Sequence, residues 1–101
     1  MAAPDAPPFR HVLRRRCQIG GRVQMVGFRM FAVDHALRLR LRGWVRNLPQ
    51  GDVEVVVEGR EPELKEFLRL LHSGPPAASV TSFVVADETS GSKLEAFRVV
   101  D

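Results

Sequence analysis

The sequence has a single cysteine and no tyrosine, and its hydrophobic residues are spread along the chain rather than gathered in long runs. With Cys17 alone, no intrachain disulfide can form, which excludes a fold that depends on oxidation. No apolar run is long enough to cross a bilayer, and the N-terminus lacks the charged-then-apolar pattern of a secretion signal. We therefore expect a cytoplasmic protein without a membrane partner. Since His11, His35 and His72 lack ligand spacing, no metal or other cofactor is expected.

The length and composition suit one small globular domain. The chain has 101 residues, of which 45% are hydrophobic and 27% charged, as in ordinary soluble domains. Prolines and alanines in residues 1–9 predict a flexible tail, which leaves residues 10–101 as a single domain. The formal net charge of +3 fits an anionic small molecule or a nucleic acid and selects neither.

The first half of the chain alternates between strand and helix patterns. Apolar and polar residues alternate over Val12–Ile19, which predicts a strand with one buried face. Over Phe28–Leu41 two apolar stripes follow helical spacing, which predicts a helix covered over a wide arc. Gly43–Leu48 and Asp52–Glu58 have strand character, and the short Pro49–Gly51 connection predicts a hairpin turn between them.

The second half completes a known arrangement of elements. Pro62 stands where a helix can begin, and the Gly74 region ends that helix. Val80–Ala86 and Ala96–Val100 follow as strands. The predicted class is α+β: a ferredoxin-like split βαβ sandwich, with the order βαββαβ plus a short C-terminal strand. Two helices would cover one face of a mainly antiparallel sheet.

Two separated motifs resemble those of the acylphosphatase family. The stretch GRVQMVGFR is similar to the family pattern G-x-V-Q-G-V-x-F-R, matched by Gly21, Val23, Gln24, Val26, Phe28 and Arg29. The pattern G-W-V-x-N follows, matched by Gly43, Trp44, Val45 and Asn47. The resemblance runs from about Cys17 to the C-terminus. It implies an enzyme that hydrolyses small acyl phosphates to a carboxylate and inorganic phosphate. We expect it to be a monomer.

The resemblance also implies roles for individual residues. Arg29 would bind the phosphate and Asn47 would position the attacking water. Backbone amides of the phosphate-binding loop would share the anion, from Gly21, Arg22, Val23, Gln24, Met25 and Val26. The residues alone support this, because a glycine-rich turn between a strand and a helix can present N–H groups to an anion. An arginine at a helix start opposes the helix dipole, which a bound anion would explain.

Two positions depart from the family pattern. Met25 and Arg40 stand where the family has glycine. If both keep a left-handed backbone, each costs roughly 1 kcal/mol. We expect Met25 to adopt that conformation, with its side chain on the neighbouring apolar surface.

Two alternative functions remain open from the sequence. One is a phosphate- or anion-binding module that has lost turnover because of Met25. The other is a small RNA-binding domain, since sheets of this fold carry that function too. RNA-binding sheets expose aromatic residues, whereas the strands here offer Ile19 and Val55–Val57. A nucleic-acid partner is therefore not expected.

Overall fold

The computed structural model describes residues 12–89 and 91–101, and the predicted tail, residues 1–9, lies outside the described residues. Strands and helices follow the predicted order, including the short C-terminal strand. They are β2 (Val12–Arg22), α1 (Phe28–Arg38), β3 (Arg42–Asn47), β4 (Val53–Arg60), α2 (Glu61–Ser73), β5 (Ser79–Asp87) and β6 (Arg98–Val99).

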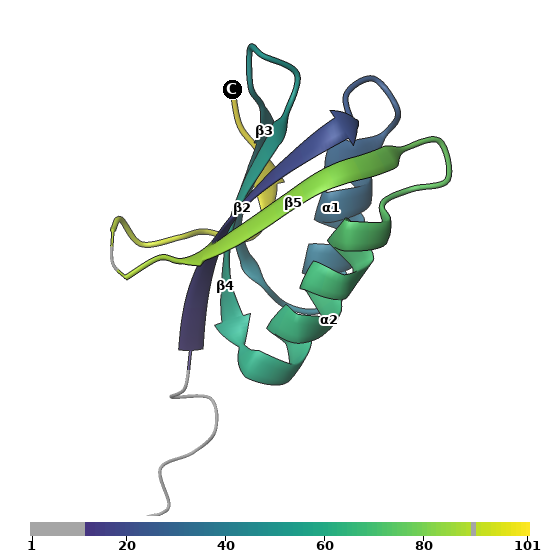
Figure 1. Ribbon diagram of the computed structural model, residues 1–101. Helices are drawn as coiled ribbons and strands as arrows, with labels where there is room; N and C mark the ends of the chain where they lie inside the picture. Colours follow the sequence, from purple (N-terminus) through teal and green to yellow (C-terminus); the bar gives the residue numbers. More distant parts are fainter. Residues whose placement is uncertain (1–11, 90) are drawn as a thin grey trace, which may run out of the picture.

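The strands form one five-stranded sheet in the order β5-β2-β4-β3-β6. Neighbouring strands run antiparallel except β3 and β6, which are parallel. Both helices lie on the same face of the sheet (Figure 1). This arrangement confirms the predicted ferredoxin-like α+β class. The predicted hairpin turn is also present, since the Leu48 N–H donates to the Asp52 carbonyl oxygen at 2.8 Å.

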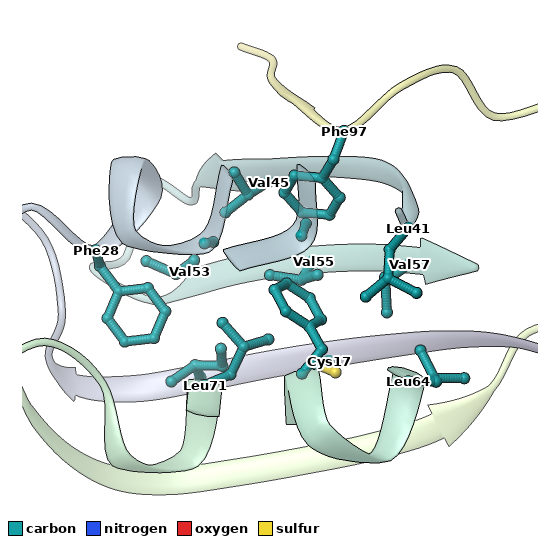
Figure 2. Packing of buried hydrophobic residues seen from close by; sticks show 14 of the residues in the cluster. Cys17, Phe28, Leu41, Val45, Val53, Val55, Val57, Leu64, Leu71 and Phe97 are labelled. Atoms are coloured by element: carbon teal, nitrogen blue, oxygen red, sulfur yellow. The ribbon is translucent and has the colours of Figure 1, made fainter. Parts of the chain in front are cut away.

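The core fills the space between the sheet and the two helices (Figure 2). Alternation along the strands points one row of side chains toward the helices. The buried cluster comprises Cys17, Ile19, Val23, Phe28, Ala32, Ala36, Leu41, Val45, Val53, Val55, Val57, Leu64, Phe67, Leu71 and Phe97. Burial raises the pKa of the Cys17 thiol to about 12, so the thiolate form is suppressed at neutral pH.

Helix α1 ends at Arg38, three residues before the predicted Leu41. Arg40 has a left-handed backbone with φ 60°. Its N–H donates to the Leu37 carbonyl oxygen, and the Leu41 N–H reaches back to Ala36 at 2.9 Å. This hydrogen-bond pair is the Schellman ending, in which the left-handed position is usually glycine. Leu41 is still buried, so the apolar periodicity outlasts the helix.

Strand boundaries also differ from the prediction, in β2 and β6 as well as by one or two residues in β3, β4 and β5. Strand β2 continues beyond Ile19 to Arg22 because it pairs with β5 past a register shift at Gly20/Gly21. A side chain at Gly21 would place its Cβ 2.1 Å from the Ser79 carbonyl oxygen, so only glycine fits this close approach. Strand β6 is shorter than predicted, because Ala96 makes a single isolated bridge.

The sheet face away from the helices carries paired charges around one aromatic ring. The buried Glu54 carboxylate accepts hydrogen bonds from Arg16 and from Arg46. Both guanidinium groups lie over the Trp44 ring, at 5.9 and 5.2 Å from its centroid. Trp44 is thus an aromatic residue on this face, which the strand sequences did not predict. Arg16 also pairs with Glu88 at 2.8 Å, so this part of the face has mixed charge.

Candidate active site

Four segments meet at one end of the sheet and enclose a pocket. The loop from β2 to α1, the start of α1, the end of β3 and strand β6 all contribute to it. Figure 1 shows the β2 arrowhead, this loop and the β3–β4 turn at the same end of the molecule. The pocket has a volume of about 270 Å³ and is lined by Val23, Met25, Gly27, Phe28, Arg29, Met30, Asn47 and Val99. It therefore brings together Arg29 and Asn47, which lie in separate motifs.

The loop backbone has the geometry of an anion-binding concavity. Met25 and Gly27 have positive φ, 63° and 81°, whereas Gln24 and Val26 do not. Such alternation turns successive N–H groups toward one concave side. Within the described part of the chain, the N–H groups of residues 23–27 donate to no backbone oxygen. We call residues 23–27 the amide cradle. It leads directly into α1, whose N-terminus attracts negative charge.

Arg29 supplies the formal positive charge of the pocket. It is the second residue of α1 and is exposed, and the first turn of this helix has no acidic residue. No ion pair joins its guanidinium to a carboxylate of the described residues. The guanidinium and the helix N-terminus thus add two positive contributions without a protein counterion, an arrangement that favours a bound anion.

Asn47 lines the pocket and carries a buried acceptor without a partner among the described residues. It is the last residue of β3 and pairs with Val53 across the hairpin. Its side-chain oxygen Oδ1 is buried and has no hydrogen-bond partner among the residues that the structure describes. A buried acceptor without a partner carries a desolvation cost. A hydrogen-bond donor in the pocket, such as a water molecule, would remove that cost.

Known proteins share the sequence pattern and the fold of this chain. A profile of the acylphosphatase family matches residues 15–99, which is most of the chain. The acylphosphatase of Trichormus variabilis is 47% identical over 84% of this chain and 84% of its own length. The chain belongs to the acylphosphatase family. Two solved structures of family members agree in fold. The Bacillus subtilis enzyme has a TM-score of 0.84 at 37% identity, covering 88% of this chain and 99% of its own. The Coxiella burnetii enzyme has a TM-score of 0.83 at 32% identity, covering 90% of this chain and 95% of its own.

Membership of the acylphosphatase family makes the chain an acyl phosphate hydrolase. Among residues 12–89 and 91–101, no group of three or more His, Cys, Asp or Glu side chains is placed to hold a metal ion. None of the described helices has the length and apolarity needed to cross a membrane.

The structure separates the predicted phosphate-binding loop into two parts. Gly21 and Arg22 belong to β2, where they pair with Val80 and Ser79 of β5. They therefore lie before the amide cradle and do not line the pocket. Val23 is buried, and Val26 packs against the core cluster.

Gln24 ties the acylphosphatase loop to the β3–β4 turn. Its amide nitrogen Nε2 donates to the carbonyl oxygens of Leu48 and Asp52, both at 2.9 Å. Asn47 immediately precedes this turn, so Gln24 fixes the position of the cradle relative to Asn47. The sequence identified Gln24 as part of the motif but did not predict its hydrogen bonds to the β3–β4 turn.

Met25 confirms one expectation and contradicts another. Its backbone is left-handed, as expected, so it adopts the conformation that the family pattern assigns to glycine. Its side chain is 98% exposed and does not rest on a neighbouring apolar surface. The methionine side chain points into solvent at the pocket, and its backbone leaves the alternation of the cradle intact.

Four residues that line the acylphosphatase pocket were not predicted as site residues, although Phe28 matches the first motif: Gly27, Phe28, Met30 and Val99. Met30 belonged to the second apolar stripe of the predicted helix, which was expected to be covered. That expectation is wrong, because Met30 and Leu37 are exposed. For Met30, the available signal in the sequence was an apolar residue in the first helical turn after the motif. The sequence around Val99 gave no such signal, since a two-residue strand has no periodicity.

Replacing either left-handed residue by glycine is expected to stabilise the fold. Met25→Gly and Arg40→Gly should each raise the free energy of unfolding by about 1 kcal/mol, because glycine adopts this backbone without a Cβ penalty. Urea denaturation midpoints test the gain, and both variants should still hydrolyse acetyl phosphate. Arg38→Gly is the matched control. Arg38 has ordinary helical geometry, so glycine there should cost about 1 kcal/mol. A loss of stability in Arg40→Gly would contradict the strain assigned to it.

Proposed function

We propose that Arg29 and the amide cradle hold the phosphoryl group of an acyl phosphate, while Asn47 orients the water that attacks it. The observation that carries this proposal is the pocket itself. Among the described residues it combines a guanidinium without an ion pair, a loop whose N–H groups donate to no backbone oxygen, and a buried oxygen without a partner. A phosphate and a water molecule would supply partners for all three.

The guanidinium and the amides would act on different oxygens of the phosphoryl group. A guanidinium presents two parallel N–H donors, which match two phosphate oxygens. The N–H groups of the cradle can hold another oxygen without carrying a full charge. Phosphoryl transfer depends mainly on such positioning and on stabilising charge at the equatorial oxygens.

Asn47 would act on the nucleophile. Its Oδ1 can accept a hydrogen bond from the water, which fixes the water in line with the bond that breaks. The water oxygen forms a bond to phosphorus, and the bond between phosphorus and the acyl oxygen breaks. The carboxylate leaves with the electron pair, and the water proton passes to a phosphate oxygen of the substrate. Because a carboxylate leaves without prior protonation, the pocket needs no strong general acid.

Release of inorganic phosphate from acetyl phosphate tests the proposal. The purified chain should release phosphate, and added inorganic phosphate should inhibit competitively because it occupies the same cradle. Binding of phosphate without turnover would instead support an anion-binding module impaired by Met25. The left-handed backbone of Met25 favours the active form, since the cradle keeps its alternation.

We also propose that the enzyme works as a monomer in the cytoplasm, without a metal ion or a nucleic-acid partner. Its lone thiol, Cys17, is buried in the core, so the fold needs no oxidising compartment. Size-exclusion chromatography and activity in the presence of a chelator test the monomer and the metal independence.

A further inference from the structure

The pocket beside the amide cradle is apolar apart from Arg29 and Asn47. Three of its apolar side chains are exposed: Met25, Met30 and Val99, with exposed fractions of 98%, 58% and 38%. They come from the loop, from the first turn of α1 and from β6, so three separate segments place an apolar group at one opening. We call these three side chains the apolar rim.

The grouping of these exposed apolar side chains around one pocket indicates a ligand-binding site. Seven large apolar side chains of the described residues are exposed, and three of them border this one pocket. Single exposed apolar residues are common, whereas a group around a hollow with convergent polar groups is typical of a binding site. Met25 strengthens this interpretation, because its side chain stands at a left-handed backbone position that glycine would adopt at a lower cost in free energy.

The rim offers contact without charge. Among the described residues no Asp, Glu or Lys lines the pocket, and Arg29 at the cradle is the one charged side chain of its lining. If the cradle holds the phosphoryl group, the acyl carbons extend from it toward the rim. A charged or hydroxylated acyl group would lose water there without gaining a partner. Methylene groups would instead leave water and contact the methionine and valine side chains, and methionine adapts well to varied apolar shapes.

We propose that this enzyme selects acyl phosphates whose acyl group is an apolar chain of several carbons, and that Met30 and Val99, together with Met25, determine this specificity. The inference rests on the proposed function, because it assumes that the phosphoryl group lies in the cradle. Full burial of one methylene corresponds to about a fourfold gain in affinity. On an open rim we expect about threefold per methylene in kcat/KM.

Acetyl and butanoyl phosphate test the selectivity without changing the reaction. Their carboxylate leaving groups have nearly the same basicity, so a difference in kcat/KM reports contact with the acyl chain. Butanoyl phosphate has two more methylenes, so its kcat/KM should be about tenfold higher than that of acetyl phosphate.

Variants of similar shape locate the selectivity on the rim. Met30→Gln and Val99→Thr keep the size of the side chain and make it polar. Each should lower the ratio of butanoyl to acetyl kcat/KM about twofold, and the double variant should lower it about fourfold, because Met25 still contributes to the rim. Inhibition by inorganic phosphate should stay unchanged, because neither side chain belongs to the cradle. Leu37→Gln and Val84→Thr are the controls. These residues are also exposed, at 51% and 61%, but lie outside the pocket, so the ratio should not change.

The outcomes separate this inference from the proposed function. Equal hydrolysis of both substrates by the parent enzyme, or a ratio that rim variants leave unchanged, would overturn the inference and leave the proposed function intact. If neither substrate were hydrolysed, the proposed function would fail instead. The rim is then judged by calorimetry with methylphosphonate and butylphosphonate, which bind without turnover. Butylphosphonate has three more methylenes and should bind about thirtyfold more tightly, and equal affinities would overturn the inference.

Discussion

Replacing Arg29 by alanine should lower kcat/KM for acetyl phosphate by about a thousandfold or more, because the variant would lose the proposed guanidinium clamp on the phosphoryl group. Affinity for inorganic phosphate should fall with it, since in this proposal the guanidinium holds the ground-state anion as well. The fold should survive, because Arg29 is exposed and makes no ion pair with the described residues. Steady-state hydrolysis and the phosphate inhibition constant measure both effects.

Two further variants separate charge from geometry in the Arg29 result. Arg29→Lys keeps the charge but not the two-pronged donor, so it should also be severely impaired. Arg38→Ala removes an exposed arginine from the last turn of the same helix and should leave activity unchanged. A phosphate inhibition constant in Arg29→Ala equal to that of the parent would refute the assignment of Arg29 as the phosphate ligand.

Replacing Asn47 by alanine should lower kcat by about a hundredfold, with little change in phosphate affinity. The proposed task of Asn47 is to orient the attacking water, an interaction that matters for the transition state more than for the bound anion. Single-turnover hydrolysis and phosphate inhibition, measured on the same preparation, separate the two quantities.

The stability of the Asn47→Ala variant distinguishes a role in orienting water from a structural role of Asn47. If Asn47 served only the turn before Pro49, its removal would destabilise the hairpin. The buried Oδ1 has no partner among the described residues, so Asn47→Ala should leave stability unchanged or slightly raise it. Gln50→Ala, on the exposed part of the same turn, is the control for a nonspecific effect. Weakened phosphate binding with a normal kcat would contradict the proposed division of labour between Arg29 and Asn47.

The order of elements could be predicted from the sequence because alternation and helical periodicity report which side chains are buried. The same signals fail where the backbone leaves regular helical or strand geometry and no glycine marks the position in the sequence. Leu41 continues the apolar stripe of α1 although the helix has ended, because the Schellman turn at Arg40 brings it back to the core. Strand β2 extends to Arg22 because of its pairing with β5, and no local pattern encodes a partner so far along the chain.

Part of the candidate site could likewise be predicted from the sequence, and part of it could not. Arg29 and Asn47 follow from the two motifs, and the free N–H groups follow from the glycines and the helix start. The Gln24 bond to the β3–β4 turn could not be predicted, since it depends on how the loop and the turn approach each other. Val99 reaches the pocket through the parallel pairing of β6 with β3, which local sequence does not reveal.

Pairing between distant strands has a consequence for the synthesis of this enzyme. Strand β2 supports the cradle, yet Ile19 pairs with Val53 and Arg22 pairs with Ser79. A nascent chain that has emerged only as far as α1 therefore contains the whole first motif without the strands that hold it in place. Contacts between residues distant in sequence also slow folding, because long loops must close before the contacts form. The acylphosphatase site should thus assemble late, once β5 and β6 have left the ribosome, and its formation should coincide with folding of the whole domain.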